Sequence, residues 1–160
     1  MVITVWIFNQ SSHIQIMLFQ NILIPFDLSN PSTHAFKVAL DIAKKYDSKI
    51  TLLTCVEGDA WRHYYYDARA HNQLLKIQSK VAKKYMEKLV VMANKVGVKI
   101  KLMILKSASV VKTITVFAKS KKMDLIVMSS HGRTGLDKLI LGSVANGVLQ
   151  RTRCPVLLIK

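Results

Sequence analysis

The sequence predicts a doubly wound α/β fold, in which an open, five-stranded parallel sheet carries helices on both faces. Short apolar runs alternate along the chain with longer segments whose apolar residues recur every three or four positions, as strands and helices alternate in such a fold. The strand segments are also apolar on consecutive residues, which is typical of parallel strands buried on both faces.

The length and composition indicate one folded domain. The chain has 160 residues, of which 51% are hydrophobic and 21% are charged, a composition typical of a globular protein and not of a disordered one. No internal repeat or linker divides it. We therefore treat residues 17–160 as one domain and residues 1–16 as an amino-terminal extension of unknown role.

The first strand is predicted at residues 21–26 (NILIPF), an apolar run that ends in turn residues. A helix follows, for which Asn30 can act as the N-cap with Pro31 at the first helical position. Its apolar positions recur at helical spacing and are Ala35, Ala39, Ile42, Ala43 and Tyr46. Residues 49–56 (KITLLTCV) form the second predicted strand.

A long helix is predicted from about residue 70 to residue 96, and Gly97 ends it. Its apolar residues step by three or four and predict one continuous apolar face. They are Leu74, Ile77, Val81, Tyr85, Leu89, Ala93 and Val96. Further strands are predicted at residues 98–105, 124–128 and 155–159, with helices around residues 110–118 and at residues 143–152.

The amino-terminal segment predicts neither export nor a membrane anchor. Residues 1–20 lack the basic start and the cleavage site of a signal peptide, and polar residues at 9–13 interrupt any membrane span. Cys55 and Cys154 each lie within an apolar run, which favours buried, reduced thiols and a cytoplasmic location. Residues 2–8 are open to three interpretations: an added edge strand, a dimer contact, or an upstream extension of the domain.

The chain is strongly basic, with 24 Lys and Arg against 9 Asp and Glu and a formal net charge of +15. Such a charge attracts polyanions over long range, so partners that carry phosphate are expected. Charge alone does not separate a nucleotide from a nucleic acid.

The most informative segment is the loop after the fourth predicted strand, at residues 129–143, which carries three of the six glycines. Ligands of open parallel sheets bind beyond the carboxyl ends of the strands. Gly132 and Gly142 leave room for a phosphate beside backbone N–H groups, and Ser143 opens a helix whose amino end favours an anion. Arg133 and Lys138 add cationic donors. The alternative is that the glycines only form turns and that Ser143 only caps the helix.

This loop resembles the motif of the universal stress protein family, which reads glycine, two residues, glycine, nine residues, and glycine followed by serine or threonine. Ser129, Gly132, Gly142 and Ser143 match its spacing without a gap, although the first motif position is serine here. The flanking sequences at 128–133, 141–145 and 154–159 are also similar to those of the family. The resemblance covers residues 17–160 and implies the Rossmann-like fold of the adenine nucleotide alpha hydrolases.

The resemblance implies a site for ATP or a related adenine nucleotide, with any Mg²⁺ or Mn²⁺ carried by the phosphates. Asp27, flanked by Pro25, corresponds to an acidic residue that approaches adenosine, and the backbone of Cys55 would read the adenine edge. Met128 would pack on the base and Ser129 would meet the ribose. The remaining nucleotide-binding candidates lie in or after the loop and are His131, Gly132, Arg133, Gly142, Ser143 and Val144.

The implied function is that of a stress-response sensor or regulator, with dimerisation of two copies through the last strand. No P-loop motif and no dinucleotide-binding glycine motif occurs, and no second carboxylate is placed beside Asp27 to hold magnesium. At most slow ATP hydrolysis is therefore expected, with no catalytic residue and no protein metal ligand. Because Ser129 replaces a glycine, an interaction module that has lost nucleotide binding is an alternative.

A basic protein that binds RNA or DNA is the other alternative. Lys76, Lys80, Lys84 and Lys88 recur every four residues on the long helix, and residues 61–66 (WRHYYY) set aromatic side chains among cations. The simpler interpretation is that the lysines form the solvated face of an amphipathic helix and that the aromatic residues pack within the fold or at an interface.

Overall fold

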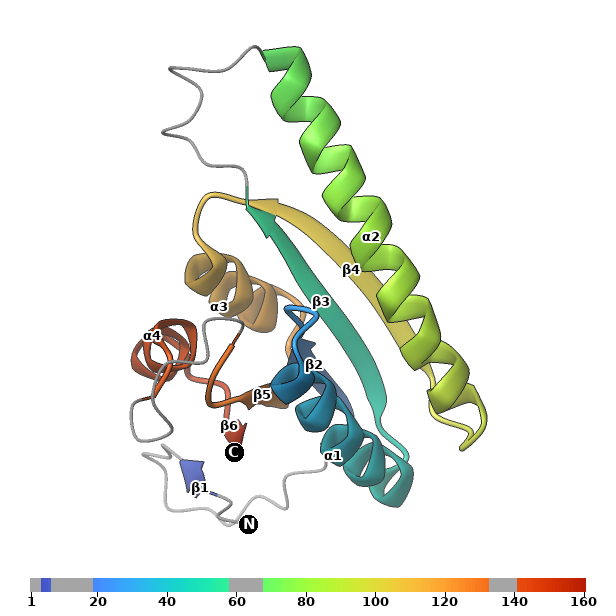
Figure 1. Cartoon of the computed structure of the whole chain (residues 1–160). Helices are drawn as coiled ribbons and strands as arrows, with labels where there is room; N and C mark the ends of the chain where they lie inside the picture. Colours follow the sequence, from blue (N-terminus) through green and yellow to red (C-terminus); the bar gives the residue numbers. More distant parts are fainter. Residues whose placement is uncertain (1–3, 7–18, 58–67, 133–140) are drawn as a thin grey trace.

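The computed structural model describes residues 4–6, 19–57, 68–132 and 141–160 (Figure 1). The elements in chain order are β1 (Thr4–Trp6), β2 (Asn21–Pro25), α1 (Asn30–Tyr46), β3 (Lys49–Glu57), α2 (Ala68–Asn94), β4 (Ile100–Ser107), α3 (Val110–Ser120), β5 (Leu125–Ser129), α4 (Ser143–Arg151) and β6 (Val156–Ile159). None of the helices in these ranges combines the length and the apolar content that a membrane span needs.

The predicted α/β architecture is confirmed. Strands β2 to β6 pair in parallel within one sheet of order β1-β6-β5-β2-β3-β4. The chain moves outward from β2 through β3 to β4, and then returns to β5 and β6 on the other side of β2. Neighbouring connections therefore diverge between β2 and β5, which is where such sheets bind ligands.

The helices form two layers, one on each face of the sheet (Figure 1). Buried residues of α1 and α2 share one apolar cluster, and buried residues of α3 and α4 share a second. The sheet between them is densely packed at its centre, where all three internal residues of β2, Ile22, Leu23 and Ile24, are 0% exposed. Burial on both faces explains why the strands read as continuous apolar runs.

Residues 4–6 form an added edge strand. β1 pairs antiparallel with β6 in the register Thr4 to Leu158, Val5 to Leu157 and Trp6 to Val156. The last strand was expected to present a free edge to a second copy, but three of its four residues are paired with β1. Of the predicted segment 2–8, the structure describes residues 4–6, and these form an edge strand.

Helix α1 begins one residue earlier than expected for its cap. Ser29 is the N-cap, because its backbone is extended and its Oγ accepts a hydrogen bond from the backbone N–H of Ser32 at 3.1 Å. Asn30 is the first helical residue and Pro31 follows it. The carboxylate of Asp27 holds the Ser29 side chain in place, and this contact could not be inferred from helix signals alone.

Helix α2 buries only two residues of the predicted apolar face, Leu89 and Ala93, and packs a neighbouring face on the sheet. Its buried residues are Leu75, Ala82, Met86, Leu89 and Ala93. Five residues of the expected face are instead exposed, namely Leu74, Ile77, Val81, Tyr85 and Val96. Two apolar series run side by side on this helix, and the buried series contains the alanines that let the helix lie close to β3 and β4.

Neither Cys55 nor Cys154 forms a disulfide bond, and both are partly buried rather than fully buried. Cys154 Sγ donates a hydrogen bond to the backbone carbonyl of Met123 at 3.1 Å. Burial, together with the nearby carboxylate of Asp124, raises the pKa of Cys154 from its ordinary value of 9.0 to about 12. The fold therefore favours the protonated thiol.

This pKa shift predicts a loss of stability in alkaline solution. An acidic group whose pKa is raised in the folded state stabilises the fold fully below its unfolded pKa, so its contribution falls as the pH rises from 9.0 towards 12. Urea unfolding at neutral pH and at a pH between these two values measures the free energy of unfolding. Between the two pH values this free energy should fall less for Cys154→Ala than for the wild type. Equal decreases in the two proteins would contradict the prediction.

Candidate functional site

A cavity of about 260 Å³ lies where the connections diverge, at the carboxyl ends of β2, β3 and β5 and beside the amino ends of α3 and α4. Its position is the one that the sheet topology predicts. The lining joins segments that are far apart in sequence, from Pro25 to Ala145.

Ten of the eleven nucleotide-binding candidates from the sequence line this cavity: Pro25, Asp27, Cys55, Met128, Ser129, His131, Gly132, Gly142, Ser143 and Val144. Arg133 lies outside the described residues, as does Lys138. The structure thus brings together residues that were selected from four separate parts of the sequence.

Six lining residues were not anticipated: Phe26, Leu53, Val110, Ile114, Ser130 and Ala145. Val110 and Ile114 lie on the first turns of α3 and form part of the apolar side of the cavity with Leu53. Their apolar spacing predicted a helix, but only the tertiary structure shows that this helix begins beside the cavity. Ser130 adjoins a predicted site residue and could have been included on that ground.

Asp27 occupies a constrained turn between β2 and α1. Its Oδ1 accepts hydrogen bonds from the backbone N–H of Ser29, at 3.1 Å, and from the Ser29 hydroxyl. Leu28 between them has a φ of 68°, a left-handed conformation that is unusual for leucine and that costs conformational energy. The carboxylate of Asp27 is therefore tied to the N-cap of α1.

Gly132 lies directly against this carboxylate. A Cβ atom at position 132 would be 2.8 Å from Asp27 Oδ2, closer than non-bonded atoms approach. The glycine is needed here because it lets the loop after β5 approach the turn after β2. The two motif segments are thus in contact at one side of the cavity.

Gly142 forms a second close approach. Its backbone N–H donates to the carbonyl oxygen of Ser130 at 2.8 Å, and a Cβ at position 142 would lie 3.0 Å from that oxygen. Gly142 is also the N-cap of α4, and no side chain caps this helix. The first hydrogen bond of α4 runs from the Asn146 N–H to the Gly142 carbonyl.

The amino end of α4 is consequently suited to an anion. The backbone N–H groups of Ser143, Val144 and Ala145 precede the first hydrogen bond of the helix and have no partner within it. All three residues line the cavity. Their N–H groups and the helix dipole together favour negative charge at this position.

His131 adds a polar group to the same region. Its Nδ1 lies 2.9 Å from the Ser130 hydroxyl, so these two atoms share a hydrogen bond. Its Nε2 is buried and has no hydrogen-bond partner within the described part of the chain. A buried polar atom of this kind gains free energy when a ligand supplies a partner.

The opposite side of the cavity is apolar, with Met128 and Ile114 buried and Cys55 partly buried. The cavity therefore combines an apolar region with a carboxylate and a helix amino end, as expected for a ligand with an apolar ring and an anionic group. Within the described ranges, no group of three or more His, Cys, Asp and Glu side chains is arranged to hold a metal ion.

Comparisons with known proteins agree with this architecture. Residues 18–160 match the model of the universal stress protein family. A universal stress protein from Methanocaldococcus jannaschii is 37% identical over 145 residues, which cover 89% of this chain and 83% of that protein. The solved structure of the universal stress protein UspA from Lactobacillus plantarum has a TM-score of 0.80 and 26% identity, and the match covers 89% of this chain and 98% of that one.

Two more distant structures hold adenine nucleotides. A universal stress protein in complex with cAMP has a TM-score of 0.65 at 20% identity, covering 89% of this chain and 97% of that chain. The universal stress protein from Archaeoglobus fulgidus in complex with dAMP has a TM-score of 0.64 at 19% identity, covering 90% of this chain and all of that chain. At these identities the likeness shows the fold. The family match and the relative from M. jannaschii show more: the chain belongs to the universal stress protein family.

Proposed function

We propose that this protein binds ATP or a related adenine nucleotide in the cavity between β2 and β5 and acts as a stress-response sensor or regulator rather than as a fast enzyme. The observation that carries the proposal is the uncapped amino end of α4, which opens onto a cavity that also offers an apolar surface and a carboxylate. Two proteins of the same fold that bind cAMP and dAMP support the choice of an adenine nucleotide.

The base would lie on the apolar side of the cavity, against Met128. The backbone of Cys55 is suited to read its polar edge, because of where β2 ends. β2 pairs with β3 as far as Leu53, whose carbonyl accepts a hydrogen bond from Phe26 at 2.8 Å. Backbone groups alternate in direction along a strand, so those of Cys55 point to the same side as those of Leu53, beyond the end of β2.

The ribose would lie between Asp27 and Ser129, since a carboxylate accepts hydrogen bonds from hydroxyl groups and a serine hydroxyl can donate or accept. The phosphates would extend over Gly132 and Gly142 to the N–H groups of Ser143 and Val144. Mg²⁺ or Mn²⁺ would enter on the phosphate oxygens, because Mg²⁺ usually takes few protein ligands. Arg133 remains a proposed phosphate ligand.

The serine at position 129 narrows the site but does not fill it, because Ser129 itself lines the open cavity. The volume of about 260 Å³ is slightly below the roughly 300–1,000 Å³ of typical small-molecule sites. A nucleoside is thus accommodated more readily than a complete triphosphate, and the phosphates would lie towards solvent over α4. Nucleotide carried through purification, identified by mass spectrometry, would separate this function from that of an interaction module without a ligand.

Pairing of two copies through the last strand is part of the proposal, with one condition that the structure adds. The edge of β6 is shared with β1 over Val156, Leu157 and Leu158. A second copy can add its own strand along this edge only after β1 leaves it. Self-association is therefore proposed to compete with the amino-terminal strand.

Nucleic-acid binding is the second candidate. The lysines of the α2 row, Lys76, Lys80, Lys84 and Lys88, are all exposed, and this observation favours contact with a polyanion. The aromatic residues 61–66, which would stack on bases, lie outside the described residues.

Gly142→Glu should abolish most of the affinity for ATP. The substitution places a carboxylate at the amino end of α4, where the phosphates would bind, so we expect at least a tenfold increase in Kd from a wild-type value in the micromolar to sub-millimolar range. Isothermal titration calorimetry measures the Kd for ATP of the wild type and of the variant. Asn146→Glu is the matched control, because it adds the same charge to an exposed position one turn later in α4. Unchanged binding by Gly142→Glu would remove the site assignment.

Gly132→Ala should weaken adenosine and ATP alike. The added Cβ lies 2.8 Å from Asp27 Oδ2 and must displace the carboxylate that would hold the ribose. Gly142→Glu should instead affect ATP far more than adenosine, which has no phosphate. If Gly132→Ala reduces the affinity for ATP while adenosine binding is unaffected, Asp27 is not the ribose ligand.

Removal of residues 1–16 should increase dimerisation. Loss of β1 leaves the β6 edge with unpaired backbone groups, and such edges associate. Multi-angle light scattering of the full chain and of the truncated chain over a range of concentrations measures the effect. A truncated chain that stays monomeric at every concentration where the full chain does so would argue against dimerisation through β6.

A further inference from the structure

Helix α2 carries an exposed apolar stripe that the fold does not use. We define this α2 stripe by its residues, which are 37–54% exposed and recur every three or four positions, with one step of seven: Leu74, Ile77, Val81, Tyr85 and Met92. At a rise of about 1.5 Å per residue, the stripe is about 27 Å long. Single exposed apolar residues are common, but an ordered row of this length is typical of a surface that binds a partner.

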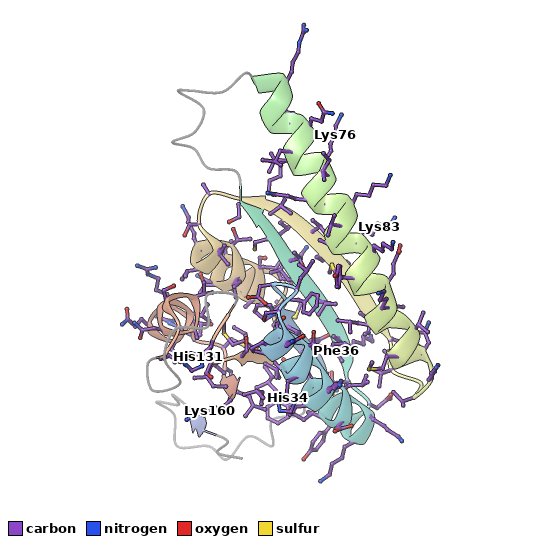
Figure 2. All side chains as sticks on the ribbon, viewed as in Figure 1. His34, Phe36, Lys76, Lys83, His131 and Lys160 are labelled. Atoms are coloured by element: carbon purple, nitrogen blue, oxygen red, sulfur yellow. The ribbon has the colours of Figure 1, made fainter. Side chains whose placement is uncertain are left out.

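The α2 stripe is separate from the face that packs on the sheet. At about 100° per residue, the buried series from Leu75 to Ala93 lies roughly 90° around the helix from the stripe. Lys76 and Lys83 lie roughly 90° to the other side of the buried series. Figure 2 shows these two lysines on the flank of α2 that faces away from α1, and the helical geometry places the stripe on the opposite flank.

The lysine row of α2 consists of Lys76, Lys80, Lys84 and Lys88, and it approaches the stripe towards the carboxyl end of the helix, because residues four apart advance about 40° around the axis. All four lysines and Lys83 are exposed; Lys76 and Lys83 lie across the helix from the stripe, and Lys88 lies beside it. Between residues 76 and 88, all of them described, the single ion pair joins Lys83 Nζ to Glu87 Oε1 at 3.9 Å, and both side chains are more than half exposed. Such a pair contributes little to stability and leaves the lysine row largely uncompensated.

The apolar and cationic parts of this surface meet at Tyr85. Lys88 Nζ lies 5.4 Å from the centre of the Tyr85 ring, which is within the range of a cation–π contact. A ligand on the stripe would therefore touch an aromatic ring and an ammonium group at the same position. This combination favours an occupant that has apolar side chains beside carboxylates.

We propose that the α2 stripe is the docking surface for an acidic amphipathic helix of a partner protein, which lies along α2 with its apolar residues on the stripe and its Glu or Asp residues against Lys80, Lys84 and Lys88. Apolar residues at helical spacing on one helix fit those of a second helix, as in other helix-in-groove contacts. The surface contributes no residue to the nucleotide cavity, so the inference is independent of the proposed function.

The charge of the chain favours this occupant over a second copy. Two copies that met through α2 would bring two rows of lysines together, each with Glu87 as its acidic neighbour, in proteins that each carry a formal charge of +15. A flat anionic membrane would complement the lysines. It would reach the stripe less readily than an elongated helix does, because the stripe lies roughly 90° around α2 from the buried face and not directly opposite that face.

The test uses the full chain and two synthetic helical peptides of identical composition. One peptide repeats Leu every three or four residues with Glu at the flanking positions, and the other has the same residues in scrambled order. Two variants of the protein separate the two parts of the surface. The stripe variant combines Ile77→Gln, Val81→Gln and Tyr85→Gln. The lysine variant combines Lys76→Gln, Lys80→Gln, Lys84→Gln and Lys88→Gln. Glutamine is used in both variants because it preserves helix propensity.

The patterned peptide should bind the wild type with an affinity about tenfold or more above that of the scrambled peptide, and the stripe variant should lose this difference. The lysine variant should bind several-fold more weakly with a reduced dependence on salt. Circular dichroism should show unchanged folding of both variants, because the substituted residues are exposed. Val116→Gln, at an exposed apolar site on α3, is the matched control and should bind the peptide as the wild type does.

Equal affinity for the two peptides up to millimolar concentration would overturn the proposal. So would a stripe variant that binds the patterned peptide as the wild type does. Three further results assign the surface to another occupant and also overturn it: a dimer that the stripe variant converts to a monomer, binding to anionic vesicles that exceeds binding to the peptide, or tight RNA binding that depends on the lysines but not on the stripe.

Discussion

The pairing of β2 with β5 at the centre of the sheet is the contact on which the rest of the structure depends. Ile22 pairs with Leu125 and Leu23 with Ile126, and all four side chains are at most 3% exposed. Asp124 secures the start of this pair by accepting hydrogen bonds from the backbone and side-chain amides of Asn21. Because the chain leaves these two strands in opposite directions, their carboxyl ends open into the cavity.

The turn after β2 joins the site to the framework. Asp27 both lines the cavity and holds Ser29, and Ser29 in turn caps α1. A ligand that engages the Asp27 carboxylate therefore acts on the first turn of a helix that packs across the sheet. The strained backbone at Leu28 is consistent with a turn whose geometry is set by this double requirement.

Local patterns were sufficient for the order of the elements, whereas ten of the sixteen residues that line the cavity were selected by those patterns together with the resemblance to the family motif. Buried parallel strands leave apolar runs, and the spacing of Gly132 and Gly142 reflects two close backbone approaches that the structure contains. Contacts between distant segments could not be predicted in this way. Val110 and Ile114 belong to the cavity only because the sheet order brings the start of α3 to it.

The face of α2 shows a different limit. Periodicity reveals that a helix has an apolar face, but α2 carries two apolar series that merge towards its carboxyl end, where the predicted residues Leu89 and Ala93 are buried. Nearer the amino end, Leu75, Ala82 and Met86 are buried in place of the predicted residues, and small or flexible side chains such as Ala82 and Met86 allow a close approach to the sheet. Where two apolar series compete, the one left outside is evidence about partners rather than about the core.

The pairing of β1 with β6 has a consequence for how the molecule is made. β1 precedes the other described strands in the chain and pairs with β6, which follows them, so this pairing cannot form before β6 has been synthesised. The closing contact spans almost the full length of the sequence, and contacts of such long range form late because they close the largest loops. The pairing of β1 with β6 is therefore expected to form after the central strands of the sheet have paired.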